Sequence, residues 1–128
     1  MSLHPKQIES ILNLSGSERY DYFIKQVADK AEAWGLFSDG WSLAQDDEGN
    51  MVFPLWPAEE YAKLCAIGDW AGHEARSIDI DDLMDGLLPK AREDGTQLGI
   101  FPSPTERGVV PTIDAFEADM NEELSKFE

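Results

Sequence analysis

Residues 51–57 read Met-Val-Phe-Pro-Leu-Trp-Pro and form the most apolar heptad of the sequence. Successive side chains of a strand point to opposite faces, and both faces would be apolar here, as in a strand that is covered on both sides. Pro54 has no N–H to give to a ladder, so either the strand is regular only up to Phe53 or one neighbouring strand stops there. The heptad predicts an interior strand that leads directly into a helix.

That helix is expected to begin at Ala58. The fixed φ of Pro57 suits the first helical position, and Glu59 and Glu60 in the first turn favour the positive end of the helix dipole. Trp56 stands where a capping Ser or Asp would be usual. Large aromatic side chains dominate protein cores, so Trp56 is either part of the core or the flank of a binding groove.

Composition indicates one folded domain. The chain has 128 residues and an apolar fraction of 42%, which is enough to bury a sizeable core. Neither a membrane-spanning stretch nor the apolar run of a signal peptide is present in the sequence. Cys65 is the single cysteine, so an internal disulfide is impossible and a cytoplasmic location is the default expectation.

The charge is strongly acidic. The formal net charge is −16, with 26 acidic and 10 basic residues. Nucleic acids and anionic membranes need basic patches on their partners, so neither is expected to bind this protein. The acidic residues either form a solvated surface that keeps the protein soluble or attract a basic partner protein.

The first 31 residues are predicted to form a helical segment. Ser15 and Glu18 have the spacing of a capping box, so a helix should begin near Ser17. Its apolar positions fall on one stripe and are Tyr20, Phe23, Ile24, Val27, Ala28 and Ala31.

Segments 33–37 and 41–45 flank Ser38-Asp39-Gly40. Asp-Gly between strand-like residues is a hairpin signal. A second polar turn, at 46–50, leads into the apolar heptad. These turns predict a three-stranded meander over 33–55.

The second half alternates strands with helices. Strands are predicted at 76–80, 97–101 and 109–110, and Asp81 is a candidate cap for a helix that Pro89 should kink or restart. Thr112 should cap a final helix, whose apolar stripe is Ile113, Phe116, Met120, Leu124 and Phe127. The alternation implies at least one crossover with parallel strand pairing.

Together these patterns predict a single α+β domain. We expect a mixed, mostly antiparallel sheet of about five or six strands with helices packed against it. A helical segment over 1–31 would precede a sheet-and-helix part over 33–128. Phe-Pro ends an apolar strand twice, at 53–54 and at 101–102. If those two strands are adjacent and parallel, the prolines would lie together at one sheet edge, where open sheets often bind ligands.

Strong catalytic signatures are missing from the sequence. It has no phosphate-binding glycine loop, no dinucleotide fingerprint and no paired-cysteine zinc site. The carboxylate clusters at 46–48 and 79–82 lack the spacing of a calcium loop. A nucleophile pair of Cys65 and His73 is conceivable, but Cys65 is expected on the buried face of a helix. We therefore expect no catalytic residue, no metal and no cofactor, which favours a non-enzymatic role.

The aromatic side chains are the better candidates for function. Four tryptophans are many for this length, and tryptophan is enriched among interface hot spots. Trp70 follows a helix in a polar loop and is either a partly exposed contact residue or a lid on the core. The candidate binding residues are Trp41, Trp56, Trp70, His73, Phe101 and Pro102.

Several segments along most of the chain carry a family likeness: Trp34-Gly35-Leu36, Gly40-Trp41, Asp47-Glu48-Gly49-Asn50, Phe53-Pro54-Leu55-Trp56-Pro57, Glu60-Tyr61-Ala62, Trp70, Leu88-Pro89, Asp94-Gly95 and Phe101-Pro102. The chain resembles a small bacterial family, found mainly in proteobacteria, that is classed as a domain of unknown function. The resemblance implies a bacterial, cytoplasmic, single-domain protein and transfers no activity. The order of elements is also similar to that of the N-terminal domain of SseB-like secretion-related proteins, in architecture only.

Two functional hypotheses follow. The first is a non-enzymatic, acidic protein–protein interaction module, such as an adaptor, a regulator or an immunity-like inhibitor, whose partner is another protein and could be basic. The alternative is a small-ligand-binding or enzymatic domain with a pocket near the Phe-Pro strand ends. The sequence leaves the partner's identity and the oligomeric state open.

Overall fold

The computed structural model describes residues 4–127, and in it the apolar heptad forms strand β3 (Met51–Leu55) as predicted. All side chains of β3 after Met51 are buried, and Trp56, which follows the strand, has no exposed surface. β3 pairs in parallel with β5 (Gln97–Ile100) and antiparallel with β2 (Ala44–Gln45). The prediction of an interior strand is confirmed.

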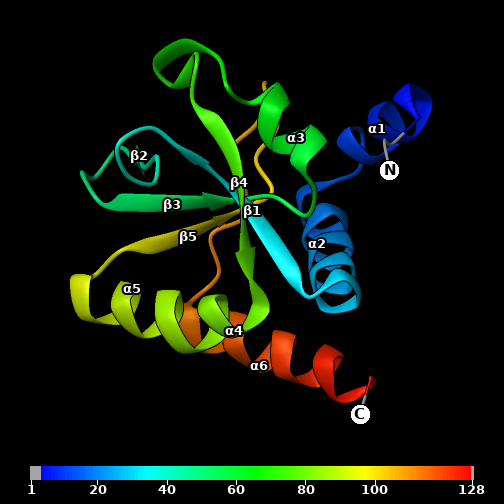
Figure 1. Cartoon of the computed structure of the whole chain (residues 1–128), viewed down its shortest axis with the longest axis vertical. Coiled ribbons are helices and arrows are strands. Elements are labelled where there is room, and N and C mark those ends of the chain that lie inside the picture. Colours follow the sequence, from blue (N-terminus) through cyan, green and yellow to red (C-terminus); the bar gives the residue numbers. More distant parts are fainter. Residues whose placement is uncertain (1–3, 128) are drawn as a thin grey trace.

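Helices surround the strands on several sides (Figure 1). The other elements, in chain order, are α1 (Pro5–Leu12), α2 (Gly16–Lys30), β1 (Glu32–Phe37), α3 (Glu59–Leu64), the 3-10 turn η1 (Gly68–Trp70), β4 (Glu74–Asp79), α4 (Ile80–Asp82), the π-helical turn η2 (Leu83–Leu87), α5 (Leu88–Asp94) and α6 (Ile113–Ser125). The prediction of a single α+β domain with a helical N-terminal segment and a C-terminal helix is confirmed.

The predicted single sheet is corrected to two small ones. Within the described residues, β1 and β4 form an antiparallel pair, and β2, β3 and β5 form a three-stranded sheet. The predicted meander over 33–55 is therefore wrong in its pairing, because β1 pairs along its whole length with β4 rather than with β2. The Asp-Gly turn is present, but the hairpin that it closes has a single bridge, between Phe37 and Trp41.

Pro54 marks the point at which β3 changes its antiparallel partner. β2 ends before it, and beyond it Trp56 exchanges backbone hydrogen bonds of 2.9 and 2.8 Å with Trp34 of β1. Pro54 has no N–H for this edge of the ladder. If β2 continued in the same register, Ser42 would lie opposite Pro54. The N–H of Ser42 donates to the carbonyl of Leu36 in β1 instead, at 2.7 Å. The expectation that one neighbouring strand stops at Pro54 is confirmed, and the missing donor is one reason why the strands divide into two sheets.

Several helix ends differ from their predictions. α3 begins at Glu59 with Ala58 as its N-cap, so Pro57 precedes the helix rather than opening it. The helix that Asp81 was expected to cap begins two residues earlier, at Ile80, and Asp79 is its N-cap. Pro89 restarts the helix as α5, and the π-helical turn η2 comes directly before it.

The helices that frame the core begin as predicted. Ser15 and Glu18 form the capping box of α2, and the Thr112 side chain accepts a hydrogen bond from the N–H of Ala115 in α6. In the stripe of α6, Phe116 and Met120 are fully buried, but Phe127 lies beyond the helix and is 59% exposed. The prediction that Phe127 belongs to the stripe was wrong, because the helix ends at Ser125 before it can bury that side chain.

The predicted strand at 109–110 is reduced to one bridge between Val109 and Ile100. Their backbones exchange hydrogen bonds of 2.7 and 3.0 Å. Pro111 follows shortly after and offers no N–H that could extend the ladder. This bridge ties the segment between β5 and α6 to the edge of the three-stranded sheet.

The three-stranded sheet has two unlike faces. The register places Phe53 beside Leu98 and Leu55 beside Ile100, and these side chains face the core. The opposite face carries Val52, Pro54, Gln97 and Gly99, which the same register brings together. Instead of a helix, the segment after β5 passes over this second face, and it leaves a groove.

Candidate functional site

A groove of about 520 Å³ lies on the second face of the three-stranded sheet. Its floor includes Val52, Pro54 and Gly99, and its sides include Trp70 and the loop over 102–108, which we call the groove loop. Position 99 needs glycine, because a Cβ there would lie only 2.8 Å from Cγ1 of Val52, which is too close for two carbon atoms. Gly99 of β5 therefore lets the side chain of Val52 in β3 pack across the sheet at the floor of the groove.

Both Phe-Pro pairs contribute to the groove. β3 and β5 are adjacent and parallel, as the prediction required, and Pro54 and Pro102 both line the groove. They are not side by side, however. Pro54 lies opposite Gly99 within the sheet, whereas Pro102 follows the end of β5 and begins the groove loop. A ligand site near these prolines stays a prediction.

A backbone turn at Phe101 directs the chain from β5 into the groove loop. Phe101 has a φ of +57°, a left-handed conformation that is costly for a bulky residue. Its N–H donates to the carbonyl of Leu55 at 2.8 Å. Its buried ring packs against Tyr61, with ring centroids 4.8 Å apart. Such strain persists only where the surroundings over-determine the conformation.

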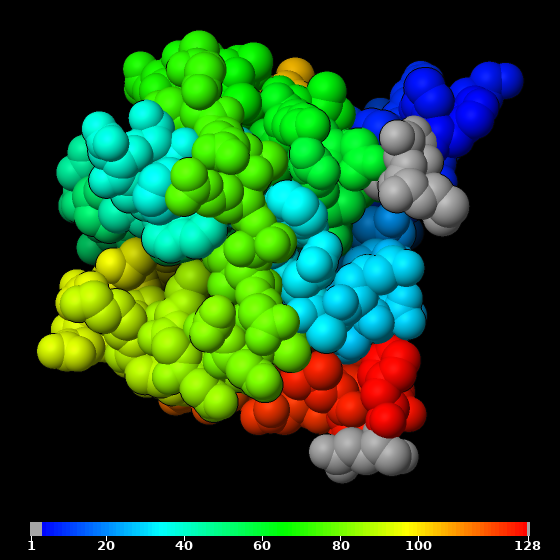
Figure 2. Space-filling view, in the orientation of Figure 1, coloured from blue at the N-terminus to red at the C-terminus, as the bar shows by residue number. Residues whose placement is uncertain are grey.

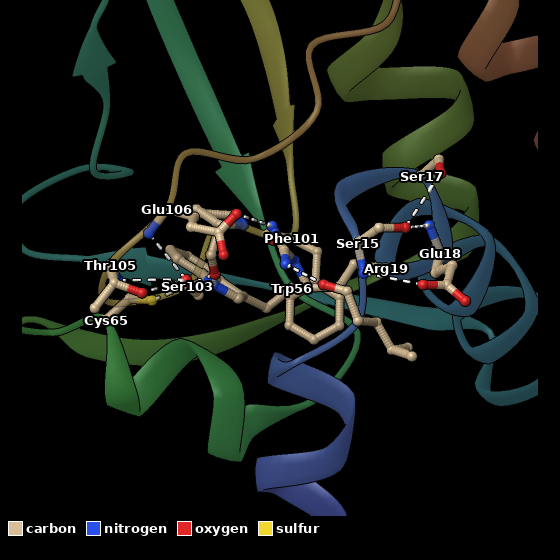
Figure 3. A network of polar contacts seen from close by, with 12 residues as sticks. Ser15, Ser17, Glu18, Arg19, Trp56, Cys65, Phe101, Ser103, Thr105 and Glu106 are labelled. Carbon is tan, nitrogen blue, oxygen red and sulfur yellow. Dashed lines mark hydrogen bonds and ion pairs between the residues drawn. The ribbon is translucent and has the colours of Figure 1, made fainter.

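Arg19 of α2 helps to hold this turn (Figure 3). The side chain is only 1% exposed. Its Nε–H donates to the carbonyl of Phe101 at 3.3 Å, and Nη1 donates to the carbonyl of Leu14 at 2.7 Å. Nη2 lies 3.8 Å from the carboxylate of Glu106 in the groove loop. Arg19 was not among the predicted site residues, although its position four residues before Phe23 places it on the buried stripe of α2.

Trp56 and Cys65 both donate hydrogen bonds to the carbonyl of Pro102, the first residue of the groove loop. The Nε1–H of Trp56 donates to the carbonyl of Pro102 at 2.9 Å, and the Cys65 thiol donates to the same oxygen at 3.5 Å. Trp70 packs edge-on against Trp56, with ring centroids 6.1 Å apart. Trp56 is therefore a core residue that also fixes the wall of the groove, and Trp70 both covers Trp56 and lines the groove.

The other two candidate residues lie elsewhere. Trp41 is 36% exposed and lines a second hollow of about 590 Å³ with Leu43 and Phe53. In Figure 2, this hollow lies between the cyan residues that follow β1 and the yellow-green surface of α5. His73 lines neither hollow, and its Nδ1 lies 2.6 Å from Oγ of the buried Ser42.

The six candidate residues thus divide into three groups. Trp70 and Pro102 line the groove, and Trp56 and Phe101 support its wall from the core. Trp41 and His73 are not part of it. Sequence reasoning found the tryptophans and the prolines, but it could not place them relative to one another.

Cys65 and His73 form no nucleophile pair, because each bonds to a different segment of the chain. Burial raises the pKa of the Cys65 thiol to about 11, and the thiolate is the reactive form. We expect the native protein to resist alkylation by iodoacetamide at about pH 8, and to react fully once it is unfolded in urea. Mass spectrometry gives the labelled fraction. Equal labelling rates with and without urea would contradict the buried position.

Acidic side chains lie in and beside the groove. Asp46 and Glu106 line it, and Asp47 and Glu48 follow Asp46 directly. A hydrogen bond from the Asn50 side chain is the main cause that holds the pKa of Asp46 below its usual value, so this carboxylate stays ionised at neutral pH.

Two cations lie among these carboxylates, and one of them is Arg19, 3.8 Å from Glu106. Arg107 of the groove loop pairs with Asp47 at 3.2 Å, and both side chains are largely exposed. The rim of the groove therefore keeps an excess of negative charge, and it would favour a positively charged group on a ligand.

Among residues 4–127, no three His, Cys, Asp or Glu side chains gather as the ligands of a metal ion would. In the same part of the chain, every helix is too short or too polar to cross a membrane.

The fold and the groove define a class of protein: a small α+β domain with an open groove and an acidic rim. The chain belongs to the family described as Protein of unknown function (DUF2750), whose model matches residues 20–120. The resemblance to a domain of unknown function is confirmed. The matched range contains both faces of the three-stranded sheet and the groove loop. No curated protein and no solved structure matches the chain.

Proposed function

We propose that this protein is an acidic interaction module that binds a segment of another protein in the groove between Trp70 and the groove loop. The observation that carries the proposal is a groove with an apolar lining, in which Val110 is 49% exposed and Trp70 is half-buried, beside an excess of carboxylates. The bound segment would combine apolar side chains with lysine or arginine.

The apolar side chains at the sides of the groove, Trp70 and Val110, would supply much of the affinity, because the floor is already buried. Burial of apolar surface contributes about 25 cal/mol per Å², and tryptophan is enriched among the residues that dominate binding energy. Trp70 is partly buried already and rests on Trp56. Little side-chain entropy would be lost when a partner covers it, and such preorganisation favours binding.

The charges would favour a basic partner and would raise the rate of association. The four carboxylates of Asp46, Asp47, Glu48 and Glu106 outnumber the two cations beside them, and the whole chain carries a net charge of −16. Such a field accelerates encounters with a basic partner and weakens when salt screens it. An adaptor, a regulator and an immunity-like inhibitor would all use this chemistry, and they would differ only in the partner that is bound.

A small molecule is the second candidate ligand. The volume of about 520 Å³ falls within the range that is usual for small-molecule pockets. The groove is also at the place expected for a ligand site, beside Pro54 and Pro102. A small ligand would need few contacts beyond the floor and would leave the acidic rim without a role, so we favour a protein segment.

A displayed library of random peptides of about 12 residues tests the proposal. Selection on the native protein should enrich peptides that combine apolar residues with lysine or arginine. Val110 lines the groove and is 49% exposed, so Val110→Glu should place a charge there without disturbing the core. We expect this variant to lose at least about tenfold in affinity for the selected peptides, as measured by fluorescence anisotropy.

Ile67→Glu is the matched control, because Ile67 is 54% exposed and lies outside the groove. It should leave the affinity unchanged, and added salt should weaken binding to the native protein. Peptides without basic residues, or equal binding to Val110→Glu and to the native protein, would refute the proposal. Small-molecule fragments that bind the groove when no peptide does would favour the second candidate.

A further inference from the structure

β2 is an edge strand of the three-stranded sheet. Ala44 lies opposite Val52, and the N–H of Asp46 donates to the carbonyl of Asn50. Residues of an antiparallel pair alternate between facing the partner strand and facing away from it. The backbone N–H and C=O groups of Leu43 and Gln45 therefore point away from β3, toward the outer side of the sheet.

This edge is short, since β2 spans only two residues, but it lacks the other features that usually protect one. Native edge strands are blocked by lysine, proline, a bulge or a covering segment. Residues 41–45 read Trp-Ser-Leu-Ala-Gln, and within residues 4–127 no strand pairs with the outer side of β2. Large apolar side chains are exposed nearby: Trp41 at 36%, Leu43 at 38% and Met51 at 40%.

A hollow lies on each face of the sheet beside this edge. Ala44 faces the groove of about 520 Å³, whereas Leu43 and Trp41 face the second hollow of about 590 Å³. Phe53 forms part of the second hollow, and α5 closes its far side with Ala91. The side chains of an added strand would alternate between the two faces, and each face offers an apolar space.

We propose that β2 accepts an extended segment of the partner protein as an added strand, with alternate side chains entering the groove and the second hollow. This inference rests on the proposed function and specifies how the partner is bound. Backbone hydrogen bonds at Leu43 and Gln45 would give affinity, and the two hollows would give sequence preference.

Charge defines the chemistry of the segment. Asp39 precedes residues 41–45, and Asp46, Asp47 and Glu48 follow them. A partner segment with alternating apolar residues and with lysine or arginine at both ends would match this pattern. A second copy of this chain fits poorly, because its own carboxylates would be brought close to these, and like charges across a strand pair destabilise it.

An N-methyl scan of the best peptide from the library tests the strand geometry. N-methylation removes one backbone donor at a time. In an added strand only every second residue donates to the protein, so the affinity should fall at least about tenfold at alternate positions and little between them. Amide hydrogen exchange at Leu43 and Gln45 should slow when the peptide binds.

Side-chain variants test the second hollow. Leu43→Glu should weaken binding of the same peptide at least about tenfold, whereas Leu64→Glu, at a position 41% exposed and outside both hollows, should not. Binding that depends on Val110 but shows neither alternation nor dependence on Leu43 would overturn strand addition and leave the proposed function standing. Failure to select any peptide would overturn both. Self-association that Leu43→Glu abolishes would assign the edge to a second copy.

Discussion

Replacing Arg19 by alanine should lower the free energy of unfolding by about 3–5 kcal/mol, because two hydrogen bonds from a buried charged group are lost and their acceptors are left unsatisfied. The acceptors are the carbonyls of Phe101 and Leu14. The ion pair with Glu106 adds little, since it is 3.8 Å long and the carboxylate is 62% exposed. Urea unfolding, followed by circular dichroism, measures the change.

Two further variants separate the hydrogen bonds from the charge. Arg19→Lys keeps the charge but has no planar fork to reach two carbonyls at once, so it should recover only part of the stability. Arg92→Ala is the matched surface control, because Arg92 pairs with Asp114 and Glu117 at an exposed site, where ion pairs contribute little. An Arg19→Ala protein as stable as Arg92→Ala would show that Arg19 does not hold the turn at Phe101.

Loss of Arg19 should also disturb the groove. Its Nε–H supports the carbonyl of Phe101, from which the groove loop starts. Without that support, the left-handed conformation of Phe101 loses one of the contacts that keep it in place. Arg19→Ala should therefore weaken peptide binding even under conditions in which most molecules remain folded.

Features that depend on neighbouring residues were predictable from the sequence. The apolar heptad predicted β3, the proline within it predicted the end of one neighbouring strand, and Ser15 and Thr112 predicted the starts of two helices. Each of these signals involves residues within a few positions of one another, where backbone geometry and capping decide the outcome.

Features that depend on distant residues were not predictable in the same way. Glu32 of β1 lies opposite Asp79 of β4, and no local pattern identifies that partner. Arg19 carries a charge, and charged side chains are almost never fully buried unless they are paired. Its two acceptors are carbonyls, one of which lies 82 positions away. The groove itself was anticipated only through the repeated Phe-Pro pairs.

Replacement of Trp56 is the second change that should lower the stability of the protein strongly. Trp56→Ala should destabilise the protein by about 3–5 kcal/mol, as for other large aromatic side chains removed from cores. Trp56 has no exposed surface, and its neighbour Trp70 would lose the ring on which it packs. The carbonyl of Pro102 would also lose its stronger donor. Urea unfolding measures the loss of stability.

Trp56→Phe separates packing from hydrogen bonding. It keeps most of the apolar volume and removes the indole N–H, so it should cost about 1 kcal/mol, the worth of one hydrogen bond, because the Cys65 thiol still donates to the same carbonyl. Trp41→Ala is the control for loss of a tryptophan, because Trp41 is 36% exposed and should matter less for stability. If Trp56→Phe binds the selected peptides as well as the native protein does, the bond to Pro102 contributes only stability. Weaker binding by a fully folded Trp56→Phe would instead show that this bond shapes the wall of the groove. A phenyl ring could still fill the core, but it has no N–H to donate to the carbonyl of Pro102, from which the groove loop extends.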